Sequence, residues 1–574
     1  MRKFFFASIL ILLHVRIFAQ VSVDANDDFY EASFSWYANR IISELPQTKP
    51  YPLPRVKAIL DEVLASGNES EKAQAQKFYE RIFGKYWNVS ASVKTENIFE
   101  RQEFSDKRKK DSYVGRIPFD TKIFGDALFK NAWTLGWKAG VDFRFLDTRK
   151  ENLLFRYAPL ENDRFVKTLS LHKNVALDFL LDAIASYTNE KISVATGYAR
   201  NGLQLFRDDS LVLSSSSAHS PFASFSVDTK RVDFLFSFKA LEASSVKDNS
   251  YRFGKFLNFA AIRFLLGKHF YVSLYDAVVY GGRFDPSYFI PVPHVLITNA
   301  NGYDDNVTMG AAFQWNLASS FVWTTELAVD TIDWTMLTHL KFNSDNRLAA
   351  KTELLYAPRS AILKFVSFDY TIVAPYMYSH WNNGDAFEWT SHANGERSLG
   401  TSLPPNSDMA RLKVRLEVLK GFFLETHALV ARHGNIYEGL AFPRDDDPLK
   451  AKKLEKFENE FNAHSIADGS IHTMNKDNAD SYGDERPYTN LFLSQDHVMY
   501  ISEGGFSLSY IVPKISYGEL KLNFDFSFSY IVNDGVDKNM CTFGTTANDA
   551  KLNWVNNIHT SYNVFVGFGI SYRY

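Results

Sequence analysis

The sequence predicts an all-β transmembrane antiparallel β-barrel of about 18 strands with a small N-terminal α-helical periplasmic segment. Several stretches alternate apolar and polar residues over about ten positions, and a strand that crosses a bilayer needs about nine to eleven residues, against about five or six in soluble proteins. The chain also ends in such a stretch. Beyond its leader, no run approaches the roughly eighteen apolar residues of a spanning helix, which excludes a helical inner-membrane protein.

Residues 1–19 have the pattern of a secretory signal peptide. A basic start precedes the apolar run from Phe4 to Val15, and small residues follow up to Ala19. We expect cleavage after Ala19. The apolar run is too short to span a bilayer, and no cysteine follows it to carry a lipid.

Residues 20–85 have helical spacing and predict two or three short helices at the periplasmic side. Asn68 and Glu71 fit a capping box, which opens a helix that ends at Gly84. The earlier helices are expected to carry Trp36, Ile41 and Leu45, up to Pro46, and then Ile59, Leu60, Val63 and Leu64.

Residues 86–574 form the predicted outer-membrane β-barrel, because the hydrophobic period changes to two. Backbone groups in lipid must pair internally, which a closed barrel achieves without helices. At about 25 to 30 residues per strand and loop, this length gives sixteen to twenty strands, and even counts are favoured, so we expect eighteen. The clearest alternating stretches are Phe129 to Phe145, Val232 to Lys239, Arg411 to Val418 and Glu519 to Tyr530.

The last stretch alternates from Tyr562 to the final residue, Tyr574. Terminal strands of this form are the recognition element of the bacterial barrel-insertion machinery, which this one resembles. We therefore expect that machinery and outer-membrane lipid as partners, and the cell outer membrane as the location. Aromatic residues near strand ends, such as Trp133, Trp137 and Tyr572, suit the interfacial girdles of such barrels.

One long interruption, residues 433–497, is rich in Asp, Lys, Asn and Gly. It predicts an extended loop on the extracellular side, with a short helix at Pro448 to Phe461.

Charge and composition exclude several functional classes. The chain has 63 basic and 66 acidic residues, intermingled, and a net charge of −3, so we expect no nucleic-acid partner. Cys541 is the one cysteine, which excludes an intrachain disulfide and a thiolate zinc cluster. His380 and His392 flank acidic residues, but no paired-carboxylate or metal-ligand spacing supports catalysis. We expect no enzyme, no cofactor and no metal.

Short stretches along most of the chain match one family. They include Tyr37-Ala38-Asn39-Arg40, Lys49-Pro50-Tyr51, Val279-Tyr280-Gly281-Gly282, Glu326 to Asp330, Ala374 to His380, Pro405 to Asp408 and Arg432-His433-Gly434. In these stretches the chain resembles the capsule-assembly Wzi family. The resemblance implies an eighteen-stranded barrel and, for capsule-making members, a surface lectin that tethers capsular polysaccharide. The 433–497 insertion departs from the family.

Two groups of side chains are candidates for glycan binding. Tyr378, Trp381 and Trp389 lie in and around one loop and could stack on sugar rings. A second group of basic residues should point into the lumen, where it would contact an acidic glycan or narrow a pore. The alternative is that these cations pair with Glu417, Asp142 and Asp233 inside the barrel. The basic residues are Arg411, Lys413, Arg415, Lys130, Lys138 and Arg144.

Three functional hypotheses remain open. The first is a barrel with a largely filled lumen that binds or anchors surface polysaccharide at its extracellular face. The second is a porin-like solute channel, for which the charged inward faces argue. The third is a surface adhesin, which rests on the long acidic loop alone.

Overall fold

The computed structural model describes residues 27–84, 87–146, 169–172, 175–229, 231–242, 254–290, 292–303, 305–331, 347–375, 377–378, 390–394, 397–434, 492–513, 518–536 and 547–574. No helix within these ranges is both long and apolar enough to cross a membrane.

In the part of the chain that the structure describes, three helices precede the barrel: α2 (Asp28–Ala38), α3 (Leu53–Ser66) and α4 (Glu69–Phe83). The predicted capping box is present in α4, where Asn68 Oδ1 accepts from Glu71 N at 3.0 Å and Glu71 Oε2 accepts from Asn68 N at 2.7 Å. These bonds satisfy two backbone donors that the first helical turn leaves unpaired. The helix ends at Gly84, as expected.

The first helix is shorter than the sequence predicts. It ends at Ala38, and the extension to Pro46 is wrong. Asn39 Nδ2 donates to Ala357 O of the barrel at 2.7 Å, and Arg40 has a positive φ of 57°, so the chain leaves the helix there to pack against the barrel. Ile41 and Leu45 are buried in the non-helical segment that follows.

Within the described residues, eighteen strands close into an antiparallel barrel, which confirms the predicted fold class. The first and last strands pair from Ser90 with Arg573 to Phe104 with His559, which completes the closure. The strands are β2 (Trp87–Phe104), β3 (Lys109–Phe129), β4 (Trp133–Leu146), β6 (Val175–Thr188), β7 (Ile192–Ala199), β9 (Ser220–Val227), β10 (Val232–Leu241), β11 (Lys255–Gly267), β12 (Phe270–Gly281), β13 (Asn306–Ala318), β14 (Phe321–Thr331), β15 (Arg347–Tyr356), β16 (Leu363–Val373), β19 (Ser407–Leu419), β20 (Phe422–Gly434), β21 (Val498–Val512), β22 (Glu519–Asp534) and β23 (His559–Arg573).

Smaller elements accompany the barrel wall. A short strand, β5 (Leu169–His172), pairs with the first residues of β6, which also pair with β4. The two-residue strands β1 (Thr48–Lys49) and β8 (Gly202–Leu203) pair with each other, as do β17 (Ala393–Asn394) and β18 (Arg397–Ser398). Helices η2 (Pro286–Phe289), α5 (His294–Asn301) and α9 (Ala547–Asn557) lie between strands.

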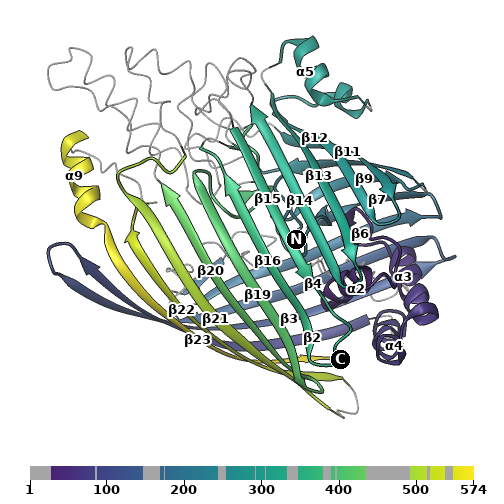
Figure 1. Ribbon diagram of the computed structural model, residues 1–574, viewed down its shortest axis with the longest axis horizontal. Coiled ribbons are helices and arrows are strands. Elements are labelled where there is room, and N and C mark those ends of the chain that lie inside the picture. Colours follow the sequence, from purple (N-terminus) through teal and green to yellow (C-terminus); the bar gives the residue numbers. More distant parts are fainter. Residues whose placement is uncertain are drawn as a thin grey trace, which may run out of the picture.

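The two ends of the barrel differ. Short turns such as residues 130–132, 319–320 and 420–421 lie at one end, which we call the turn end, together with α2 to α4 and the C-terminus (Figure 1). Longer connections, including those that carry α5 and α9, lie at the opposite end, the loop end. Outer-membrane barrels have the same asymmetry.

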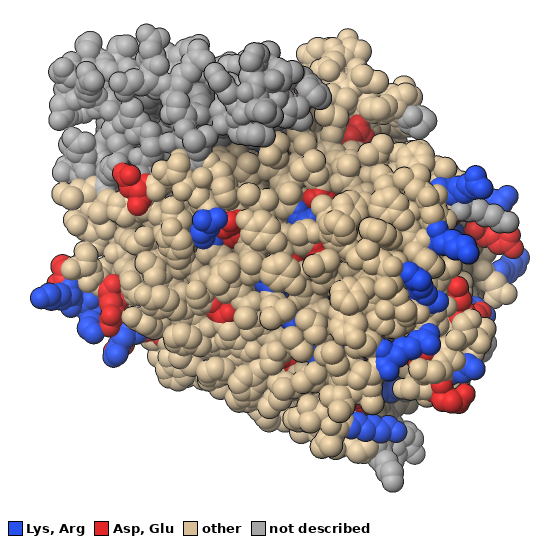
Figure 2. All heavy atoms as spheres, in the orientation of Figure 1, with Lys and Arg blue, Asp and Glu red and all other residues tan. Residues whose placement is uncertain are grey.

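Along β22 the side chains alternate between the two faces of the wall. Ser527 and Ser529 are each 1 % exposed and point inward, whereas Phe528 and Tyr530 are 42 % and 37 % exposed on the outside. Figure 2 shows that the outer surface of the strand wall is mostly uncharged and that the Lys, Arg, Asp and Glu residues gather toward the ends of the strands. An apolar band flanked by charge is the outer surface that a bilayer requires.

One predicted strand is in fact two. The alternation from Phe129 to Phe145 is interrupted by the turn at residues 130–132, where Lys130 and Asn131 have positive φ values of 49° and 56°. Lys130 is therefore exposed in a turn and does not point into the lumen, contrary to expectation.

Candidate functional site

A connection from the loop end folds back into the barrel. We call residues 200–219 the plug segment. Its central residues Leu211, Val212 and Leu213 are fully buried, although the segment has no regular structure except β8. Through β8 it pairs with β1 of the N-terminal segment, with Thr48 opposite Leu203. The plug segment and the N-terminal segment therefore meet within the molecule.

The buried carboxylate of Glu326, on β14, holds the middle of the plug segment. Its Oε1 accepts from Ser210 Oγ at 2.8 Å and from Tyr275 Oη of β12 at 2.7 Å, and its Oε2 accepts from Leu211 N at 2.7 Å. Hydrogen bonds to a carboxylate are among the stronger ones. Glu326 thus fixes both a side chain and the backbone of the segment.

Basic residues of the neighbouring wall hold the preceding part of the segment. Asp208 Oδ2 accepts from Arg411 at 2.6 Å and from Lys413 at 2.9 Å. Burial alone would raise the pKa of Asp208, but Lys413 and Arg411 beside it lower that pKa well below its ordinary value. Asp208 is therefore ionised and paired. Lys351 Nζ of β15 donates to the carbonyl of Asp209 at 2.6 Å.

Hydrogen bonds join the plug segment to at least six strands of the wall in the described part of the chain. These bonds run from Asn201 to β10, Leu205 to β13, Ser210 and Leu211 to β14, Asp209 to β15, Arg207 to β16 and Asp208 to β19.

A second connection, described over residues 390–394 and 397–403, packs against the plug segment. His392 Nε2 lies 2.6 Å from Val212 O, and Ser214 N donates to Leu399 O at 2.7 Å. Burial lowers the pKa of His392 to about 4, so the ring is neutral near pH 7 and Nε2 is the donor to the carbonyl. The two connections pack as one unit within the lumen.

The helices close the turn end in a similar way. Phe29 and Trp36 of α2 belong to a buried cluster that includes the wall residues Val322, Leu355 and Phe365. Glu31 of α2 forms an ion pair with Arg415 of β19. Helix α2 therefore packs against the inner side of the wall at the turn end.

Two small cavities lie where these parts meet. One cavity of about 40 Å³ is bordered by Gln47, Asn201 and Leu235, and another of about 20 Å³ by Gln204 and Arg263. Such volumes hold one or two water molecules.

The structure places the predicted glycan-binding residues as follows. The three basic residues of β19 do point inward. Arg411 pairs with Asp208 and Asp369, and Lys413 pairs with Asp208. Arg415 pairs with Glu31. Tyr378 is 2 % exposed, donates from Oη to Leu211 O at 2.8 Å and stacks on His392 with ring centroids 5.7 Å apart. Trp381 and Trp389 lie outside the described residues. These bonds do not test a contact between these side chains and a glycan, which remains a prediction.

The prediction that the inward-pointing basic residues pair with Glu417 and Asp233 is wrong, because both carboxylates pair with other basic residues. Glu417 pairs with Lys364 at 2.6 Å, and Asp233 pairs with Arg263 at 2.6 Å. Lys138 pairs with Asp182 at 2.7 Å. Sequence reasoning missed Asp208, Glu326 and the plug segment altogether, because an irregular buried segment has no hydrophobic period to reveal it. The one available signal was the pair of acidic residues Asp208 and Asp209 immediately before the apolar run 211–213.

No family model matches the chain, and no curated protein matches it. Solved structures do match. The chain is similar to Wzi of Escherichia coli, which is described as an outer-membrane protein involved in group 1 capsule assembly and as a carbohydrate-binding β-barrel. The two structures have a TM-score of 0.54 and 10 % sequence identity, and the match covers 95 % of this chain and 98 % of Wzi. OccAB2 of Acinetobacter baumannii has a TM-score of 0.38, 10 % identity and coverage of 85 % and 98 %. OprD of Pseudomonas aeruginosa has a TM-score of 0.35, 8 % identity and coverage of 84 % and 93 %. The likeness to Wzi confirms the fold that the sequence resemblance implied.

Proposed function

We propose that the chain is an occluded outer-membrane barrel that binds or anchors surface polysaccharide at its extracellular face. The observation that supports an occluded lumen is the plug segment, which is hydrogen-bonded to at least six strands of the wall. A solute path along the barrel axis at this level would have to displace the segment.

The plug segment is a permanent part of the barrel rather than a gate. Its withdrawal would take Asp208 from Lys413 and Arg411, and Ser210 and Leu211 from the buried carboxylate of Glu326. A buried charge that loses its partner costs about 3 to 5 kcal/mol. Several such costs exceed what the binding of one small solute supplies.

The orientation follows from the two ends. The turn end, with α2 to α4, faces the periplasm, and the loop end faces the outside, as in other barrels of this class. The strand wall contacts outer-membrane lipid, and β23, which ends beside Tyr574, engages the insertion machinery. Export would use the signal peptide at residues 1–19.

The long connections at the loop end supply the glycan surface. Wzi is described as carbohydrate-binding, and we extend that activity to this chain because the two share a barrel fold over most of their lengths. Since Tyr378, Arg411 and Lys413 contact the plug segment, we assign the sugar-stacking role to Trp381 and Trp389.

Binding is tested with the purified mature protein in detergent and the organism's own surface glycan at sub-millimolar concentration. We expect the unmodified protein to bind the glycan saturably, and the double variant Trp381→Ala/Trp389→Ala to bind it at least tenfold more weakly. The control is Trp554→Ala, which replaces the buried tryptophan of α9. If its barrel folds, this variant should bind like the unmodified protein. The absence of binding by the unmodified protein would overturn it.

The second candidate function is a porin-like solute channel. The charged inner faces favour it, because side chains such as Arg116 and Glu96 form ion pairs where β2 and β3 meet. Electrical recording separates the two functions.

A further inference from the structure

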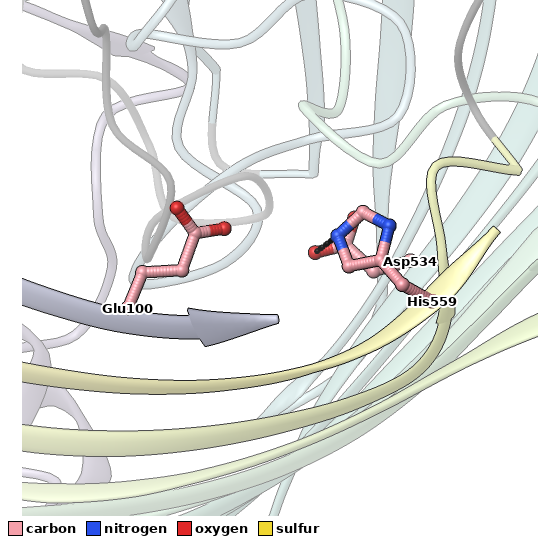
Figure 3. A group of neighbouring side chains, drawn as sticks. All are labelled: Glu100, Asp534 and His559. Atoms are coloured by element: carbon pink, nitrogen blue, oxygen red, sulfur yellow. Dashed lines mark ion pairs between the residues drawn. The ribbon is translucent and has the colours of Figure 1, made fainter. Parts of the chain in front are cut away.

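Three metal-ligating side chains converge at the loop end of the barrel, apart from the plug segment. Glu100 lies on β2, Asp534 ends β22 and His559 begins β23 (Figure 3). Strand pairing brings them together, because β23 lies between the other two strands, with Asp534 opposite His559 and His559 opposite Phe104. One ligand atom from each residue lies within 4.8 Å of the others.

All three side chains are buried, with exposed fractions of 5 % for Glu100, 2 % for Asp534 and 7 % for His559. Two carboxylates in such a place are costly unless a cation or protons balance them. Glu100 accepts hydrogen bonds from Gln102 Nε2 and Ser112 Oγ, both at 2.8 Å, and both donors are neutral.

The hydrogen bonds of His559 prepare one ring nitrogen as a ligand. Its Nδ1 lies 2.7 Å from Asn557 O. A carbonyl only accepts, so Nδ1 carries a hydrogen, and in the neutral ring Nε2 then keeps its lone pair for a ligand. Nε2 is buried and makes no hydrogen bond. It lies 3.7 Å from Asp534 Oδ2, an ion-pair contact that Figure 3 marks with a dashed line. Metal-binding histidines have this arrangement, with the second ring nitrogen bonded to a backbone carbonyl.

The carboxylates are oriented in the same manner. Ser561 Oγ donates to Asp534 Oδ2 at 2.6 Å, and Gln102 and Ser112 hold Glu100. Neutral donors that fix the rotamers of ligating side chains are the usual outer shell of a metal site.

We propose that Glu100, Asp534 and His559 bind one divalent transition-metal ion, for which Zn²⁺ is the fitting probe. One imidazole nitrogen with two carboxylate oxygens suits zinc, whereas calcium takes oxygen ligands alone. Small side-chain rotations bring the ligand atoms to the roughly 2.0 to 2.2 Å that zinc requires. The ion would cross-link three adjacent strands where the barrel closes. This proposal does not rest on the proposed glycan binding.

The test uses the full mature protein in detergent, without a polyhistidine tag and after treatment with chelator. Calorimetric titration with Zn²⁺ should give one ion per chain, and His559→Gln and Glu100→Gln should each weaken binding on the order of tenfold or more. His427→Gln is the matched control. His427 pairs with Glu503 at 3.2 Å, and within the described residues that pair has no third ligand.

Heat-dependent gel mobility establishes that each variant is folded, and Glu100→Gln carries the test if His559→Gln does not fold. Co²⁺ provides a second readout, because its visible absorption spectrum should change on binding to the unmodified protein and not to His559→Gln. A failure to bind Zn²⁺, or equal binding by the unmodified protein and both ligand variants, would overturn the proposal.

Discussion

Arg411 of β19 bonds Asp369 of β16 at 2.9 Å through Nε while its Nη2 reaches Asp208 of the plug segment at 2.6 Å. One guanidinium therefore joins two neighbouring wall strands, β16 and β19, to the plug segment. Its planar fork presents fixed N–H donors to both carboxylates at once.

Loss of this link should destabilise the barrel. Arg411→Met keeps much of the side-chain volume but takes the guanidinium from Asp369 and leaves Asp208 with Lys413. We expect the free energy of unfolding to fall by about 3 to 5 kcal/mol. Urea unfolding in detergent micelles measures it. Arg101→Met is the control, since the pair between Arg101 and Asp111 is mostly exposed and its loss should leave the midpoint unchanged. Equal midpoints for Arg411→Met and the unmodified protein would contradict the assignment.

The neutral His392 should make stability depend on pH. Its folded-state pKa is about 4, below the ordinary value of about 6.5, so only the unfolded chain takes up this proton between those limits. Stability from this group is full above pH 6.5 and falls as the pH drops toward 4, by roughly 3 kcal/mol at most.

The measurement is the difference in unfolding free energy between the unmodified protein and His392→Gln at a series of pH values. The comparison is necessary because Asp27, whose pKa burial raises to about 6, titrates in the same range with the opposite sign. We expect the advantage of the unmodified protein to shrink between pH 6.5 and 4. A constant difference would show that His392 does not titrate there.

Helix α2 should contribute to the stability of the whole barrel. Trp36 is 2 % exposed in the cluster that α2 shares with the wall, and Trp36→Ala should cost about 3 to 5 kcal/mol through the cavity it leaves. Gln74→Ala, at an exposed position of α4, is the control. If Trp36→Ala affected only the fluorescence of the helices while the barrel unfolded as before, the helices would be an independent domain.

The sequence predicted the wall far better than the interior. Period-two alternation arises because lipid lies on one side of a strand and the lumen on the other. The outward direction of Phe528 and the inward direction of Ser529 can therefore be predicted from the local sequence alone. The boundary at Lys130 was missed because a three-residue turn barely interrupts the alternation.

The interior depends on pairs distant in sequence, which no local pattern encodes. Asp208 meets Lys413 and Glu31 meets Arg415, and the choice among many acidic partners is made by the register of the strands. The inward direction of Arg411, Lys413 and Arg415 was predictable from alternation, but their partners were not. The same holds for Glu100 and His559, whose approach depends on barrel closure.

Planar-bilayer recording tests the central claim, an occluded lumen, most directly. The mature protein should give no steady conductance, while a variant in which a short glycine linker replaces residues 204–216 should open a sustained current. A steady open conductance from the unmodified protein would contradict the account and favour the channel.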